Sequence, residues 1–330
     1  MPSDGPLPST MHLSRLARGS FGDCLLITSI FKSDTAVFTV LNAAAAIRLW
    51  SEAVADIVAK VFGLYDYYCT ADLFFIRLLS MNDAPLCSII TVVYNAELLV
   101  ERTMQSVQSQ TLLSYEHIVI DGASKDRTLD IVKRFERTAL RVFSEPDKGI
   151  YDAMNKGLKH AKGTFVIFMN GGDEFYDEHV LKRVLEGNED TDFIYGETAV
   201  VDEHGNVLGD RRLKPPAKLT WRSLQRGMCV SHQSILVRRE LTEPYDLNYK
   251  ISGDIDWTIR MLRKSKSIVN AGCYISKFLE GGVSASRRKQ GLKERFHIMQ
   301  KHYGLTTTLL NHFFILLRYP VHRLTRRSMT

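Results

Sequence analysis

The sequence of 330 residues has few cysteines and no long apolar run. Its five cysteines, Cys24, Cys69, Cys87, Cys229 and Cys273, are scattered without a close pair, which argues against a disulfide framework and against a zinc site built on cysteines. No segment approaches the roughly 20 consecutive apolar residues that cross a bilayer. The first residues also lack a signal peptide with a clean cleavage site. These absences predict a cytoplasmic protein.

The chain also lacks a strong charge of one sign, except at its end. The net charge is +6, and the apolar content of 45% is that of a globular protein. From Val283 to Thr330, however, ten lysines and arginines stand against a single acid, Glu294. No nucleic-acid motif accompanies this basic excess, and Leu309 to Leu317 is too apolar for a solvated arm, so we expect no nucleic-acid partner. An amphipathic segment of this kind favours contact with an anionic membrane surface on the inner face of the cell membrane, and packing on the domain is the alternative.

The chain divides into three parts. Residues 1–80 hold apolar clusters without a rhythm of strands and helices, which predicts an atypical N-terminal extension, either a misassigned start or a remnant of another domain. A helical appendage packed on the main domain is the alternative. Residues 81–285 read as a complete domain, with a first half over 85–175 and a second over 176–285. Residues 286–330 are predicted to form a basic, amphipathic helical tail.

Apolar strands alternate with amphipathic helices in the first half of this domain. The pattern predicts strands over 87–94, 116–121, 139–144 and 164–169 and helices over 97–110, 126–137 and 150–161. This βαβαβαβ order is typical of an α/β fold with a mainly parallel central sheet flanked by helices. In the second half we expect a hairpin over 198–210, a strand over 233–238 and a helix over 254–263.

Polar residues follow three of the predicted strands. Asn95, Asp121, Asn170 and Asp173 stand at or just beyond strand ends, and the carboxyl ends of parallel strands face one crevice in which open α/β sheets bind ligands. By pattern alone, Asp121 with the following Ser124 is a helix cap. The run Asn170-Gly-Gly-Asp173 is, on the same reading, a turn that carries a surface acid.

Two further motifs have a less common composition. In the segment from Ser144 to Gly157, a proline and Gly149 set the turn into a helix on which Asp152, Asn155 and Lys156 share one face. A structural role is expected for Asp152. Further along, Ser252-Gly-Asp254-Ile-Asp256-Trp257 opens a helix, where either aspartate can serve as a cap or as a first-turn acid favoured by the helix dipole.

The order of these motifs across residues 81–330 resembles the family 2 glycosyltransferases with the GT-A fold, in particular bacterial enzymes of exopolysaccharide, capsule and lipopolysaccharide assembly of the colanic-acid type. The resemblance does not extend to residues 1–80. It implies an inverting transfer of a sugar from a nucleotide-sugar donor to a saccharide acceptor, which we expect to be lipid-linked. The chain departs from the family pattern at Asn170 and Gly172, which replace two acids, and at Gly253, which replaces a glutamate.

The resemblance assigns a role to each candidate residue. Asp254 is the expected base, because an inverting transfer needs a carboxylate to take the proton of the acceptor hydroxyl. Asp173 is the expected ligand of a divalent cation, Mn²⁺ or Mg²⁺, that neutralises the leaving diphosphate. The residues expected to bind the nucleotide-sugar are Val93, Asn95, Glu97, Asp121, Ser124, Asp147, Asn155, Asn170 and Gly171. Those expected on the acceptor and diphosphate side are His232, Gln233 and Arg287, the last in a loop beginning at Gly281 that would close over the diphosphate.

Two other functions remain open at this point. A sugar-phosphate nucleotidyltransferase would need a basic, glycine-rich loop after the first strand, where this chain has Tyr94-Asn-Ala-Glu97. A catalytically silent protein that binds saccharide or membrane is the other possibility, because Gly172 and Gly253 stand where the family motifs have acids. A dinucleotide-dependent dehydrogenase is excluded, since no G-x-G-x-x-G follows that strand. The sugar, the nucleotide and the acceptor depend on a pocket that residues 198–250 shape.

Overall fold

The computed structural model describes residues 84–135, 139–279 and 287–313. The chain divides between Met81 and Asn82, and every described residue belongs to the second unit. The extension predicted over residues 1–80 therefore lies outside the described residues. The same holds for the loop that begins at Gly281 and for the tail beyond Phe313.

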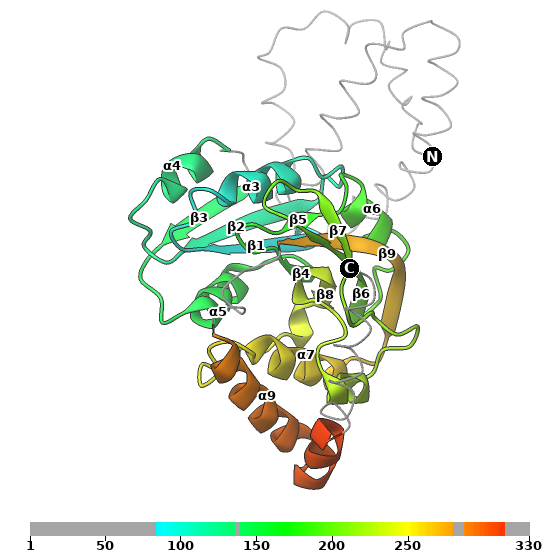
Figure 1. Ribbon diagram of the computed structural model, residues 1–330. Helices are drawn as coiled ribbons and strands as arrows, with labels where there is room; N and C mark the ends of the chain where they lie inside the picture. Colours follow the sequence, from blue (N-terminus) through cyan, green and yellow to red (C-terminus); the bar gives the residue numbers. More distant parts are fainter. Residues whose placement is uncertain (1–83, 136–138, 280–286, 314–330) are drawn as a thin grey trace, which may run out of the picture. The chain divides into compact units, whose positions relative to one another are not determined.

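A nine-stranded sheet forms the centre of this unit (Figure 1). Its strands lie in the order β3-β2-β1-β4-β8-β6-β9-β5, and β7 pairs with β6. The strands are β1 (Cys87–Val93), β2 (Tyr115–Asp121), β3 (Leu140–Ser144), β4 (Phe165–Phe168), β5 (Glu174–Phe175), β6 (Phe193–Val201), β7 (Val207–Asp210), β8 (Ile235–Arg238) and β9 (Ile268–Leu279). The first four in this order are parallel, as predicted, whereas the remainder of the sheet is mixed.

Helices cover both faces of the sheet. The α-helices are α3 (Val100–Gln108), α4 (Thr128–Lys133), α5 (Ile150–His160), α6 (Val180–Leu185), α7 (Gly253–Lys264) and α9 (Arg288–Tyr303), and short 3₁₀ helices occupy η4 (Trp221–Arg226), η5 (His232–Ser234) and η6 (Arg239–Leu241). In Figure 1, α3, α4 and α6 lie on one face, and α5, α7 and α9 lie on the other. The α/β fold predicted from the sequence is confirmed.

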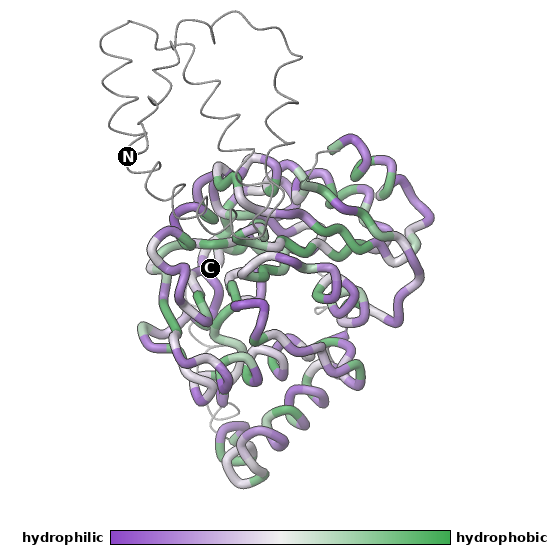
Figure 2. Tube along the Cα trace, turned by 180° about the vertical axis from the view of Figure 1, so that it is seen from behind, coloured by the Kyte–Doolittle hydropathy of each residue, from purple (hydrophilic) through white to green (hydrophobic). Residues whose placement is uncertain are grey.

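The core follows the alternation of side chains along the strands. Ile90 and Val92 of β1 pack in a cluster with residues of α5, α7 and α9, whereas Val93 packs with α3 and α4. Successive side chains of a strand point to opposite faces, so a strand covered on both sides is apolar throughout. All seven residues of β1 are accordingly buried. Figure 2 shows hydrophobic residues concentrated along the strands and hydrophilic ones on the outer helices and loops.

A glycine sets the distance between α5 and the sheet. A Cβ atom added at Gly157 would lie 2.4 Å from Cγ2 of Ile90 on β1, closer than two carbon atoms can approach. Gly157 therefore allows α5 to approach the sheet closely. This contact holds α5 against the sheet, and the first turn of α5 carries Tyr151 toward α7.

The first part of the predicted basic tail is helical and packs on the domain. Helix α9 packs on α7, and Ile298 and Met299 of α9 are buried in the main core. The acid Glu294 accepts hydrogen bonds from the backbone N–H groups of residues 250, 251 and 252, at 3.0, 2.8 and 2.9 Å. Its helix is therefore part of the domain and fixes the loop that enters α7. The amphipathic character begins later, where Leu309, Leu310 and Phe313 are more than half exposed.

Candidate active site

The carboxyl ends of four parallel strands meet at one edge of the sheet. Val93, Asp121 and Ser144 are direct neighbours across β1, β2 and β3. Beyond the end of β4, the backbone N–H of Gly171 donates to the carbonyl of Val92 at 3.2 Å. The structure thus brings the predicted residues of the first half to one place, as the parallel arrangement requires.

Asp121 is buried at this edge and holds the shape of the loops around it. Its Oδ2 accepts hydrogen bonds from the N–H of Ser124 at 3.1 Å and from the hydroxyl of Ser144 at 2.6 Å. Asp147 lies above the backbone of Gly122, since a Cβ atom added there would lie 2.4 Å from Oδ2 of Asp147. The two acids therefore flank one turn, and a contact of Asp121 with a nucleotide base stays a prediction.

The loops after β1 and β2 are tied together by the residues that the sequence singled out. The N–H of Asn95 donates to Oγ of Ser124 at 2.8 Å, and Oδ1 of Asn95 accepts from the N–H of Lys125 at 2.9 Å. Asn95 has a positive φ of 46°, a region in which asparagine is enriched. Oε2 of Glu97 accepts from the N–H of Arg127 at 3.1 Å. These contacts shape the rim of the site, and any further contact with the donor would be additional.

Asn155 has partners other than the one predicted. Its Nδ2 donates to the carbonyl of Tyr245 at 3.0 Å, and its Oδ1 accepts from the N–H of the same residue at 2.6 Å. The amide thus joins α5 to the segment before α7, and a contact of Asn155 with a nucleotide-sugar stays a prediction. The predicted structural role of Asp152 is observed, since its Oδ2 accepts from the N–H of Lys148 at 2.9 Å.

A row of three side chains connects the two halves of the domain. Nδ2 of Asn170, just after β4, lies 2.9 Å from Nε2 of His232, and Nδ1 of His232 lies 3.9 Å from Oδ2 of Asp254. Oδ1 of Asn170 is buried and has no hydrogen-bond partner. Turning the amide over would leave its nitrogen without a partner instead. One polar atom of Asn170 is therefore available to a ligand in either orientation.

Asp254 is more accessible than His232. It stands in the first turn of α7, and its side chain is 24% exposed, against 14% for His232. The hydroxyl of Tyr151 donates to Oδ1 of Asp254 at 3.4 Å. Burial, aided by the negative charge of Asp254, holds the pKa of Tyr151 well above its usual range, so the phenol stays protonated and can donate.

The environment of His232 disfavours the charged form of its imidazole. Burial lowers the pKa of the imidazole below its usual value, and the charge of Arg211 acts in the same direction, while the charge of Asp254 opposes it. A neutral imidazole has one donor and one acceptor nitrogen. If Nε2 accepts from Asn170, the ring proton lies on Nδ1, the atom that faces Asp254.

Asp173, the expected metal ligand, is buried and engaged with the protein. Its Oδ2 accepts a hydrogen bond from Nε2 of Gln233 at 2.8 Å, and its backbone carbonyl accepts one from Thr103 at 2.8 Å. Burial raises the pKa of the Asp173 carboxyl to about 7, although the bond from Gln233 opposes this shift. Gln233 is in turn held by Ser231.

These donors do not fit a metal site built by the protein. Divalent cations such as Mg²⁺ and Ca²⁺ prefer charged carboxylates. Asp173 is instead paired with an amide, and the position before it is Gly172. Within the described residues, no group of three or more histidines, cysteines, aspartates or glutamates could hold an ion.

Arg287, which was predicted to face a diphosphate, is exposed and stands just before α9. Its backbone carbonyl accepts from the N–H of Gly291 at 3.1 Å. The glycine-rich loop that would bring it over a ligand lies outside the described residues. Its role stays a prediction.

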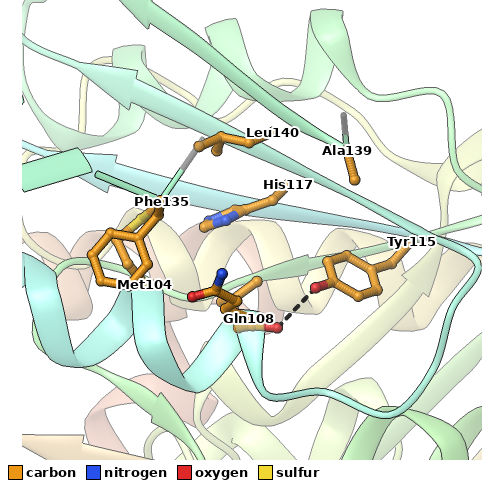
Figure 3. Close-up of a pocket in the computed structure, with 8 residues that line it drawn as sticks. Met104, Gln108, Tyr115, His117, Phe135, Ala139 and Leu140 are labelled. Carbon is orange, nitrogen blue, oxygen red and sulfur yellow. Dashed lines mark hydrogen bonds between the residues drawn. The ribbon is translucent and has the colours of Figure 1, made fainter. Parts of the chain in front are cut away.

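A small cavity elsewhere in the sheet is not this site. Met104, His117, Phe135 and Leu140 are among the side chains that line it (Figure 3). It lies near the start of β2 and β3, whereas Asp121 stands at the opposite end of β2. Burial lowers the pKa of His117 to about 3, and Nε2 of this histidine is 2.9 Å from the hydroxyl of Thr91. The cavity therefore holds a neutral histidine that already has a partner.

Comparison with known proteins decides the family. The pattern described as Glycosyl transferase family 2 matches residues 88–245. A "PGL/p-HBAD biosynthesis glycosyltransferase" of Mycobacterium bovis is 32% identical over 190 residues, which cover 54% of this chain and 70% of that protein. The chain belongs to glycosyl transferase family 2. It is a glycosyltransferase, as the order of its motifs predicted.

Other similar proteins agree with this assignment. The "Putative teichuronic acid biosynthesis glycosyltransferase TuaG" of Bacillus subtilis is 25% identical over 234 residues, which cover 66% of this chain and 92% of that protein. The crystal structure of S. aureus TarS 1-349 in complex with UDP-GlcNAc has a TM-score of 0.53 and 19% identity, with 69% of this chain and 72% of that one covered. That structural likeness confirms the expected GT-A type of fold.

Proposed function

We propose that this family 2 glycosyltransferase moves a sugar from a nucleoside-diphosphate sugar to a hydroxyl of a saccharide acceptor, with inversion at the anomeric carbon. The position of Asp254 carries the proposal. It is a partly exposed carboxylate at the start of α7, held beside His232 and Tyr151, and linked through His232 to Asn170 at the nucleotide edge of the sheet. This position near the end of β4 supports the assignment of Asp254 as the base.

The reaction is a single displacement. Asp254 takes the proton of the acceptor hydroxyl as that oxygen forms a bond to the anomeric carbon. The bond between the anomeric carbon and the diphosphate oxygen breaks, and the diphosphate leaves with the electron pair. A positioned general base contributes roughly 10²–10⁴-fold in rate. Tyr151 and the neutral His232 orient the carboxylate, and the free amide atom of Asn170 can bind the ribose or a phosphate.

The divalent cation enters the proposal without a complete site among the described residues. Mn²⁺ or Mg²⁺ would supply Lewis-acid stabilisation of the leaving diphosphate. The described donors do not fit such an ion, as Asp173 and Gly172 show, so no step is routed through it. Asp173 instead accepts a hydrogen bond from Gln233, which lies beside His232 in η5.

The acceptor is proposed to be a lipid-linked saccharide of a cell-surface polysaccharide or glycoconjugate. The names of the relatives, which refer to PGL/p-HBAD and teichuronic acid biosynthesis, support this class. No helix among the described residues combines the length and the apolar character needed to cross a bilayer. Contact with an anionic membrane surface would instead use the exposed Leu309, Leu310 and Phe313, which precede further basic residues in the sequence.

A thermal-shift screen of the full chain against UDP, GDP, CDP, ADP and dTDP tests the donor, with and without Mn²⁺. A ligand that binds only the folded state raises the apparent stability, by about 2.7 kcal/mol at one hundred times its Kd. We expect one nucleotide to raise Tm, and Asp173→Asn to retain the response to that nucleotide and to Mn²⁺. Stabilisation by none of the five would contradict the proposed donor class. A Mn²⁺ response lost only in Asp173→Asn would restore Asp173 as the metal ligand.

Sedimentation with lipid vesicles tests the membrane contact. The full chain is expected to bind vesicles that contain phosphatidylglycerol more strongly than vesicles of phosphatidylcholine alone, because basic residues are attracted to an anionic surface. Replacing Leu309, Leu310 and Phe313 together by serine should weaken that binding. The same three changes should leave the response to nucleotide intact. Equal sedimentation with both lipids, or of wild type and variant, would contradict the contact.

A further inference from the structure

Two partly buried arginines, each with one buried nitrogen that lacks a partner, lie near the proposed base. Arg211 follows β7, and Arg295 belongs to α9, yet their charges are close enough to act on each other, and Arg211 is close enough to act on Asp254 and His232. Nη1 of Arg211 and Nε of Arg295 are buried without a hydrogen-bond partner. One guanidinium nitrogen of each arginine is therefore buried without an acceptor atom among the described residues.

Three other partly buried arginines among the described residues form ion pairs. Arg102 pairs with Glu174, Arg141 with Glu116, and Arg260 with Asp256 and Glu243. A guanidinium keeps its charge at all ordinary pH values, and burying a charge without a partner is costly. Burial lowers the pKa of Arg211, while the charge of Asp254 opposes this shift. The unpaired guanidinium groups thus resemble a binding site whose anion comes from a ligand.

The location of the two arginines indicates whether that anion would belong to the donor or to the acceptor. The residues expected to bind the nucleotide follow β1, β2 and β4, at the parallel edge of the sheet. Arg211 and Arg295 come from the second half of the chain, on the side of α7 and its Asp254. The fork of an arginine donates paired hydrogen bonds to the oxygens of a phosphate or a carboxylate.

We propose that Arg211 and Arg295 bind an oxyanion of the acceptor, a phosphate or carboxylate group near the hydroxyl that Asp254 deprotonates. The inference rests on the proposed function, because the assignment of Asp254 as the base identifies the acceptor side. It predicts that the enzyme selects acidic or phosphate-bearing acceptors. The two guanidinium groups hold the anion. Helix α9 thus contributes a binding residue, Arg295, and through Glu294 it also fixes the loop before α7.

Titration calorimetry of the full chain with inorganic phosphate, and separately with acetate, tests the site at constant ionic strength. Charge-assisted hydrogen bonds are strong, so Arg211→Gln and Arg295→Gln are each expected to weaken binding of phosphate by about ten-fold or more. The exposed neighbours Arg212 and Lys293 provide matched controls, and Arg212→Gln and Lys293→Gln should bind phosphate as the wild type does. Arg211→Lys keeps the charge without the fork and should fall between. Equal affinity in Arg211→Gln and Arg212→Gln, or no binding of phosphate or acetate to the wild type, would overturn the proposal.

The source of the anion is tested with the same variants and the nucleoside diphosphate that stabilises the wild type. An acceptor site predicts that Arg211→Gln loses phosphate binding but keeps its nucleotide-induced rise in Tm. Parallel loss of both would assign the arginines to the diphosphate of the donor and overturn the acceptor assignment. Phosphate binding that depends on Arg211, in a chain that no nucleotide stabilises, would reject the donor class and leave the anion site standing. Unfolding curves confirm that each variant is folded. If Arg211→Gln does not fold, the same comparison of phosphate binding and nucleotide response is made with Arg211→Lys and Arg295→Gln.

Discussion

Replacing Asp254 with asparagine is expected to lower kcat by about 10²–10⁴-fold, the usual contribution of a general base. The amide has nearly the same shape as the carboxylate and can still accept a hydrogen bond from Tyr151, but it cannot take the proton of the acceptor. Other residues, at the carboxyl ends of β1, β2 and β4, are proposed to bind the nucleotide, so nucleotide binding should be unchanged. Initial rates of transfer and thermal shifts with the nucleotide measure the two quantities separately.

The matched control is Asp130→Asn, which alters an exposed acid in the first turn of α4. This change should leave kcat within about two-fold of the wild type, because it alters only a surface charge near a helix dipole. Activity of Asp254→Asn within a few fold of the wild type would remove Asp254 from the role of base. A loss of nucleotide binding in the same variant would show that the residue acts on the donor instead.

Replacing Asp256 with alanine is expected to destabilise the protein by about 3–5 kcal/mol, the cost of removing one partner of a buried ion pair. The Asp256 side chain has no exposed surface, and its oxygens lie 2.8 Å from His302, 3.0 Å from Lys301 and 2.9 Å from Arg260. It therefore links α7 to α9 rather than only complementing the dipole of α7. Urea-induced unfolding at neutral pH measures the loss.

The same contacts make this contribution depend on pH. Burial favours the neutral form of the carboxyl, but hydrogen bonds from His302, Lys301 and Arg260 outweigh it and hold the pKa of Asp256 well below its usual range. Because the pKa is lower in the folded state, the stabilisation is fully present above the pKa of the unfolded chain, about 4. It is lost as the pH falls toward the pKa of the folded state. The stability difference between wild type and Asp256→Ala should therefore shrink below pH 4.

Asp246→Ala is the control for this prediction. Asp246 also faces Lys301, at 3.7 Å, but its side chain is 30% exposed. An exposed pair contributes roughly 0–1 kcal/mol. Similar losses in the two variants would mean that burial does not strengthen the Asp256 cluster. A loss below about 1 kcal/mol in Asp256→Ala would contradict the role of this residue as the link between α7 and α9.

The first half of the fold could be predicted because its strands are buried on both faces. Each of β1 and β4 is an uninterrupted run of buried residues, and both were placed within one residue at each end. Strand β9 was missed since most of its residues are only half-buried, which leaves no clear apolar alternation. Helix α6, which has six residues, was also missed.

The site was predictable where it depends on motifs and unpredictable where it depends on distant contacts. The motif order indicated Asp254 and His232, and the structure places them 3.9 Å apart. The partners of Asn155 and Asp173 lie 90 and 60 residues away in the sequence, so no local pattern could predict these contacts. Glu294 stood out as a single acid in a basic segment, a signal of its contact with residues 250–252. Arg211 lies in a charged run that is typical of a surface.

The anomeric configuration of the product tests the central claim most directly. The full chain is incubated with an α-linked nucleotide-sugar carrying the nucleotide that raises its Tm, together with a lipid-linked saccharide acceptor. The coupling constant of the new anomeric proton is then read by NMR. Attack on the face opposite the leaving diphosphate, with Asp254 as the base, predicts a β-linked product. An α-linked product would contradict the single displacement and the role assigned to Asp254.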